Sequence, residues 1–166
     1  MEFRPNDEDY AVRTAIDIQT SDFDVSKEMA WLRADSSDMG AVVAFVGLVR
    51  DFSERPDVQG LYLEHYPGMT ERSLADIASE AGERWPLQAL RIIHRVGELT
   101  PGEQIVLVLA GSAHRGDAFA ACEFVMDYLK VRAPFWKKER TSAGDQWVES
   151  RDGDQVRAEK WRQTRD

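Results

Sequence analysis

The chain has little cysteine and no long apolar run. Cys122 is the only cysteine among 166 residues, which excludes a disulfide within the chain and a zinc site built on several cysteines. No apolar stretch approaches the roughly 20 residues that a membrane-spanning helix needs. The N-terminus, MEFRPNDEDY, is acidic, whereas a signal peptide begins with positive charge. These absences predict a cytoplasmic protein with no membrane partner.

Basic residues are in the minority. The chain has 21 Lys and Arg against 30 Asp and Glu, a formal net charge of −9. Nucleic-acid-binding proteins usually present a broad basic surface, so no nucleic-acid partner is expected. The length suits a single domain with one proper core. We therefore expect residues 1–166 to form one domain, with flexible tails at residues 1–9 and 152–166.

The positive charge that is present gathers in one stretch. Residues 128–140 contain five basic residues and one acid, a local net charge of +4. Such a cluster within an acidic chain predicts a site for a small anionic ligand.

Strand and helix patterns alternate along the chain, which predicts one α+β domain with a mixed or antiparallel sheet. A short helix is expected near Val25, and a second helix is expected to begin at Thr70 and to be closed by Pro86. The third, at about Gly116–Val131, has Phe119 in its buried stripe and stops at Pro134. Gly40–Val49 is nearly all apolar, which favours a strand covered on both faces. The other expected strands are Tyr10–Gln19, Gln59–Tyr66, Leu90–Val96 paired with Gln104–Ala110, and Phe135–Arg140 joined by a turn to Gln146–Glu149.

His114 and Arg115 lie where an apolar strand gives way to this third helix. The start of a helix has unpaired N–H groups and a positive dipole end, so it favours phosphate or carboxylate. Arginine adds a bidentate fork for such groups. A plainer interpretation, in which His114 caps the helix and Arg115 is solvated, fits the spacing equally well. For Arg50, the plain interpretation is an exposed arginine at a strand end.

Lys130 falls on the last turn of the third helix, where a lone lysine simply favours the helix C-terminus. Lys137 changes this interpretation, because Pro134 turns the chain and lets Lys137 return towards Lys130. Two ammonium groups held together repel, which lowers the pKa of at least one of them. A lysine of lowered pKa can serve as a nucleophile or proton-transfer group.

The remaining reactive residues are interpreted as structural. Cys122 lies among apolar residues and is expected to be a buried, inert thiol. His65 and His94 occupy alternating strand positions, with no spacing that suggests a metal site, so neither a metal nor a cofactor is expected. The tryptophans Trp85, Trp136 and Trp147 are expected to anchor the core or an interface.

Several motifs together resemble the family of the large, catalytic subunit of molybdopterin synthase. The run MDYLKVRAPFWKKE at residues 126–139 is long and unusual, and the likeness extends over roughly residues 10–151. One departure is Leu48, where family members often carry lysine. The other matching stretches are GLVR (47–50), LEHYPGM (63–69), IHRVGEL (93–99), SAHR (112–115) and GDQWVESR (144–151).

This resemblance implies an α/β hammerhead-type fold with an added antiparallel β subdomain. It also implies a heterotetramer, in which a homodimer of this chain carries a small ubiquitin-like subunit at each end. The C-terminal Gly-Gly tail of the small subunit, activated as a thiocarboxylate, enters a pocket on the large one. Two sulfurs then pass in turn to cyclic pyranopterin monophosphate, which becomes the dithiolene of molybdopterin as its cyclic phosphate opens.

The resemblance also assigns roles to residues. Lys130 and Lys137 match the catalytic lysines, with Lys130 beside the incoming thiocarboxylate. The anionic substrate would be bound by Arg50 and, in a pocket that draws on both copies of the dimer, by His114, Arg115 and Arg151. Phe45 and Met126 would line the pocket.

Two rival functions are kept. A sulfurtransferase working through a persulfide on Cys122 would lose activity with Cys122→Ser. A non-catalytic homologue that binds an anion or a protein tail would tolerate Lys130→Ala with binding intact.

Overall fold

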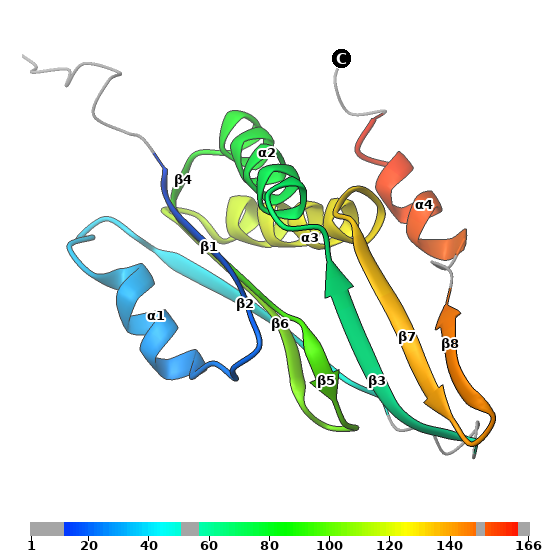
Figure 1. The fold of residues 1–166 in the computed structure, drawn as a ribbon. Helices are drawn as coiled ribbons and strands as arrows, with labels where there is room; N and C mark the ends of the chain where they lie inside the picture. The colour runs from blue at the N-terminus through cyan, green and yellow to red at the C-terminus, as the bar shows by residue number, and fades with distance from the viewer. Residues whose placement is uncertain (1–11, 51–56, 149–151, 163–166) are drawn as a thin grey trace, which may run out of the picture.

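The computed structural model describes residues 12–50, 57–148 and 152–162. The described chain contains two four-stranded sheets and four helices (Figure 1). The strands are β1 (Arg13–Gln19), β2 (Ala41–Leu48), β3 (Val58–His65), β4 (Leu87–Arg95), β5 (Gly97–Leu99), β6 (Gln104–Ser112), β7 (Phe135–Thr141) and β8 (Gly144–Val148). The helices are α1 (Val25–Arg33), α2 (Met69–Arg84), α3 (Arg115–Arg132) and α4 (Asp152–Glu159).

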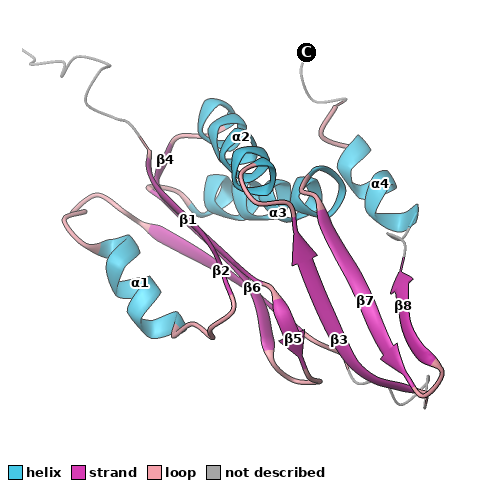
Figure 2. Cartoon of the chain, in the orientation of Figure 1, coloured by secondary structure: helices cyan, strands magenta, loops and turns pink. Residues whose placement is uncertain are grey.

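Sheet A has the strand order β1-β4-β6-β2. Strand β1 is parallel to β4, while β6 is antiparallel to both β4 and β2. The predicted pairing of Leu90–Val96 with Gln104–Ala110 is confirmed in β4 and β6. Helices α2 and α3 cover one face of this sheet, and α1 covers the other (Figure 2). The mixed sheet and its helices confirm the predicted α+β class.

Sheet B has the order β5-β3-β7-β8 and is antiparallel throughout. The predicted hairpin of the last two strands is confirmed in β7 and β8. The three-residue strand β5 was not predicted. It follows β4 after a single residue, Val96, so the chain passes from sheet A into sheet B at this point.

Strand β2 differs from the expected strand covered on both faces. It is the edge of sheet A, and the side chains of Phe45 and Leu48 are 40% and 57% exposed. A buried strand and an apolar edge strand have the same composition, so the apolar run did not distinguish them. Just before β2, Gly40 lies against the chain leaving β6: a Cβ there would stand 2.2 Å from the Ala113 carbonyl oxygen.

Two further expectations are corrected by the packing. Phe119, placed in the buried stripe of α3, is 62% exposed. The charged segment from residue 152, expected to be a loose tail, forms α4 and lies against α3. Trp161, just after α4, packs into the main core cluster and donates its indole N–H to Asp127 at 2.7 Å. No helix in the described part of the chain is long and apolar enough to cross a membrane.

Candidate active site

The turn between α3 and β7 brings the two candidate catalytic lysines to one region. Helix α3 ends at Arg132, and β7 begins three residues later at Phe135. Lys130 is exposed on the last turn of the helix. Side chains alternate along a strand, so Lys137 lies on the same face of β7 as Phe135.

A threonine at the start of α2 holds this turn in place. The buried Thr70 hydroxyl donates to the carbonyl of Pro134 at 3.1 Å and accepts from the backbone N–H of Tyr66 at 2.9 Å. This one hydroxyl therefore joins two segments that are 64 residues apart in sequence. One is the start of α2, and the other is the turn that contains Pro134. The sequence alone does not show this contact.

His65 and His94 stand beside the same turn. His65 faces Phe135 across the β3–β7 pair, and its Nε2 lies 3.3 Å from Oε1 of Glu71. His94 stacks on Phe135 with ring centroids 3.9 Å apart and an interplanar angle of 19°. Burial lowers the pKa of His94 to about 4, and the nearby charges of Lys130 and His65 act in the same direction. Lys130, His65 and His94 are therefore neighbours.

Acid should destabilise the fold through His94. Its pKa is about 4 when folded, against an ordinary value of 6.5, so its contribution to stability is complete above about pH 6.5 and is lost as the pH falls towards 4. We expect the free energy of unfolding to drop by about 2 kcal/mol between about pH 7.5 and pH 5 through this group. Urea unfolding of wild type and His94→Phe at both pH values measures it. An equal drop in the variant would contradict the assignment.

The cationic cluster predicted from residues 128–140 does not form one surface. Arg132 pairs with Glu80, and Arg140 pairs with Glu98. Lys138 follows Lys137 on β7, so alternation places it on the opposite face. Its Nζ lies 4.6 Å from the ring centroid of Trp147. Of the five basic residues in this cluster, Lys130 and Lys137 are thus the two that remain as candidates for a site at the α3–β7 turn.

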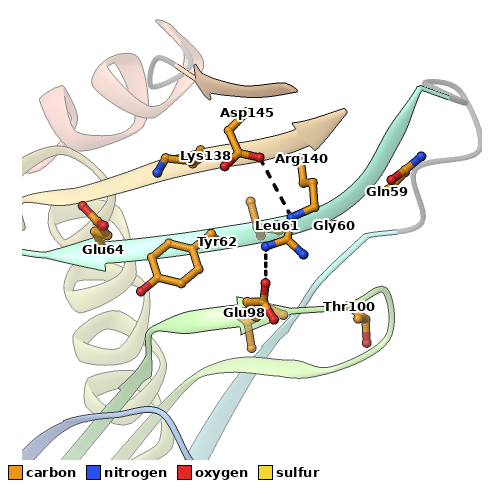
Figure 3. A pocket seen from close by; sticks show the side chains of 11 residues that line it. Gln59, Gly60, Leu61, Tyr62, Glu64, Glu98, Thr100, Lys138, Arg140 and Asp145 are labelled. Carbon is orange, nitrogen blue, oxygen red and sulfur yellow. Dashed lines mark hydrogen bonds and ion pairs between the residues drawn. The ribbon is translucent and has the colours of Figure 1, made fainter. Parts of the chain in front are cut away.

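A cavity of about 370 Å³ lies on this opposite face of sheet B (Figure 3). Tyr62, Lys138 and Arg140 line it, and Arg140 is held between Glu98 and Asp145, with its Nε 3.9 Å from Oδ1 of Asp145. The Arg140 guanidinium is therefore already paired with two carboxylates of the same chain. Neither Lys130 nor Lys137 lines this cavity, although Lys138 and Arg140 of the same basic cluster do.

His114 and Arg115 are exposed at the start of α3. His114 occupies the N-cap position and Arg115 is exposed, as the plainer interpretation predicted, although the His114 side chain makes no capping hydrogen bond. Fifteen residues separate Arg115 from Lys130, which corresponds to about 22 Å along a helix at 1.5 Å per residue. Within one chain, the start of α3 is therefore far from Lys130.

The other predicted binding residues are distributed more widely. Arg50 is exposed where the chain leaves β2, and Phe45 is partly exposed within β2. Met126 is buried in the core cluster, one turn before Lys130. It could therefore form only the buried floor of a pocket. Arg151 lies outside the described residues. Among the described residues, no group of three or more His, Cys, Asp or Glu could hold a metal ion.

Cys122 has the surroundings of an inert thiol. Its side chain is 4% exposed, and the thiol donates to the carbonyl of Val108 at 3.8 Å. Burial raises the pKa of this thiol to about 12. A thiol and not a thiolate is present at neutral pH, and the thiolate is the nucleophilic form.

The α+β fold, with its mixed sheet A and its antiparallel sheet B, is that of a known class of biosynthetic subunit. The family model described as "MoaE protein" matches residues 18–132. This chain belongs to the MoaE family.

Relatives of known sequence or structure match along most of the chain. The molybdopterin synthase catalytic subunit of Pseudomonas aeruginosa is 58% identical over 147 residues, which are 89% of this chain and 98% of the relative. The solved MoaE protein of Burkholderia ambifaria has a TM-score of 0.78 and 54% identity, covering 89% and 97% of the two chains. Molybdopterin synthase from Staphylococcus aureus has a TM-score of 0.73 and 32% identity, covering 80% and 95%.

Proposed function

We propose that this chain is the catalytic subunit of a molybdopterin synthase. It would transfer sulfur from the C-terminal thiocarboxylate of a small ubiquitin-like subunit to cyclic pyranopterin monophosphate. The observation that carries the proposal is that a chain of this family has Lys130 on the last turn of α3 and Lys137 just after the turn, on β7. Its close relatives carry the name of the same catalytic subunit, and a subunit implies a partner. The reaction belongs in the cytoplasm.

Both molecules that must meet at the site are anions. The substrate carries a phosphate, and the partner tail ends in a thiocarboxylate. Ammonium groups at the turn supply the matching charge in a chain of net charge −9. As sulfur adds to the pterin and the cyclic phosphate opens, protons must move. A lysine placed at the reacting atoms can move them, and we assign this role to Lys130 and Lys137.

Substrate binding is proposed to use two copies of the chain. Arg50 would contact the substrate, while His114 and Arg115 stand about 22 Å from Lys130 within one chain by the helix rise. A homodimer supplies the anion-binding helix start of the second copy, together with its Arg151. Within the heterotetramer, one copy would then bind the substrate phosphate at each site, and the thiocarboxylate tail would lie beside Lys130 of the other copy. No resident metal or cofactor is part of this proposal.

A reconstituted reaction tests the proposal. The purified chain, the substrate and the small subunit are mixed, with the small-subunit tail either as a thiocarboxylate or as a plain carboxylate. The proposal expects dithiolene product with the thiocarboxylate alone. Tight binding of the small subunit without product would instead favour the non-catalytic tail-binding homologue.

Replacing Cys122 should leave turnover intact. Because the thiol is buried and its pKa is raised to about 12, we expect kcat of Cys122→Ser to stay within about 3-fold of wild type at equal folded fraction. Alkylation by iodoacetamide should require unfolding. Loss of product with Cys122→Ser in a folded protein would move the chemistry to a persulfide on this residue.

A further inference from the structure

His94 is a polar ring on an apolar face. It lies near the end of β4, where alternation places it on the same face as Leu90 and Ile92, which belong to the main core cluster. Its side chain is 4% exposed. After it the chain crosses into β5 and sheet B, so the ring lies at the junction of the two sheets.

One hydrogen bond defines the state of this ring. Nδ1 of His94 lies 2.8 Å from the carbonyl oxygen of Arg95. A carbonyl can only accept a hydrogen bond, so Nδ1 must carry the proton. A neutral ring then has its lone pair on Nε2. The bond also restrains the ring plane, which a hydrocarbon side chain at this position could not do.

The His94 ring packs against β7, the strand that carries the candidate catalytic residue Lys137. His94 stacks on Phe135 at 3.9 Å and 19°, which joins sheet A to the first residue of β7. Lys137 follows two residues later on the same face of that strand. Movement of the Phe135 ring would therefore move the start of β7 and, with it, Lys137.

The His94 ring is also close to the other candidate catalytic lysine, Lys130. The charge of Lys130, on the last turn of α3, acts directly on His94. From β3, His65 also faces the ring and is itself paired with Glu71 of α2. A charged imidazole would repel Lys130, whereas a neutral one can pack beside it. The polar ring thus packs on Phe135, close to Lys130, without adding charge.

We propose that His94 is a positioning residue for sulfur transfer, whose neutral ring holds Phe135 and so sets where Lys130 and Lys137 stand. The inference rests on the proposed function. It adds to that function a role for His94, which is a purely structural residue in the sequence-based prediction. His94 is given no contact with substrate, so its effect should appear in kcat and not in binding of the small subunit.

Truncating the ring tests this directly. We expect His94→Ala to lower kcat by about 10- to 100-fold, because a displacement of about 1 Å can cost as much as 100-fold in rate. The Kd for the small subunit should change by less than about 3-fold. Ile93→Ala is the matched control: Ile93 is also buried on β4 but belongs to the cluster on the α1 side. Its kcat should be unchanged at equal folded fraction. Equal kcat losses in the two variants would overturn the proposal.

Two more conservative variants separate the ring from its polar atoms and serve if His94→Ala does not fold. His94→Phe keeps a flat ring against Phe135, while His94→Gln keeps a hydrogen-bonding group without the ring. Stacking predicts a kcat at least about 10-fold higher for the Phe variant than for the Gln variant. An equal or reversed order would overturn the role of the stack.

A readout without turnover keeps this inference separate from the proposed function. The 13Cε resonances of Lys130 and Lys137 can be followed by NMR in the free protein. Both should shift in His94→Ala and stay in place in Ile93→Ala. If wild type makes no product but these shifts occur, the proposed function fails and the positioning stands. Unmoved resonances in His94→Ala would overturn the positioning.

Discussion

Lys130→Ala should lower kcat for molybdopterin formation by at least about 100-fold, because positioned proton transfer by a side chain contributes about 10²- to 10⁴-fold to a rate. Lys130 is exposed at the end of α3, so its loss removes no core packing. The melting temperature should therefore stay close to that of wild type. Lys130→Arg should not restore the rate, since a guanidinium keeps its proton at all working pH values.

Lys138→Ala is the matched control for this prediction. Lys138 follows Lys137 in sequence but faces Tyr62 and Trp147 on the opposite side of β7. Its removal should change kcat by less than about 3-fold, as expected for a side chain outside the reacting centre. Steady-state product formation with a saturating thiocarboxylated partner measures both variants. If the two variants lost activity equally, general charge and not the α3–β7 turn would explain the rate.

Phe124→Ala should produce the largest loss of stability. Phe124 is fully buried, and its ring contacts Trp85, Trp161 and Tyr128 at centroid distances of 5.3, 5.6 and 4.7 Å. Truncating a buried phenylalanine costs about 3–5 kcal/mol through lost transfer free energy and the cavity left behind. The same rings hold Trp161, so α4 should detach from α3 at lower urea concentration than the rest of the fold unfolds.

Phe119→Ala provides the comparison on the same helix. Its ring is 62% exposed, and surface substitutions usually change stability by no more than about 0.5 kcal/mol. Urea unfolding followed by tryptophan fluorescence compares the two variants. A loss for Phe119→Ala as large as that for Phe124→Ala would mean that α3 presents a different face to the core.

The sequence predicts the part of the site that depends on local structure. The apolar repeat of α3 and the stop at Pro134 correctly predict the end of this helix and the turn into β7. Lys130 lies before this turn and Lys137 after it. The pairing of β4 with β6 is local enough to follow from two adjacent strand patterns. The α+β class follows from the same alternation of elements.

Long-range placement could not be predicted in this way. The charge cluster of residues 128–140 is continuous in sequence, yet alternation along β7 divides it between two faces. Two of its arginines pair with the distant residues Glu80 and Glu98. The packing of Trp161 against α3 depends on one aromatic anchor in a polar segment. The burial of His94 agrees with its interpretation as a structural residue, but its stack on Phe135 joins strands of two different sheets, which the sequence does not show.

The most direct test of the account is to follow the sulfur atom. The small subunit is prepared with a ³⁴S-labelled thiocarboxylate, allowed to react with substrate on this chain, and both the product and the chain are examined by mass spectrometry. The account predicts labelled dithiolene in the product and an unmodified Cys122 at every time point. A covalent adduct of the small subunit on Cys122 before product appears, or no labelled product from the wild-type chain, would contradict it.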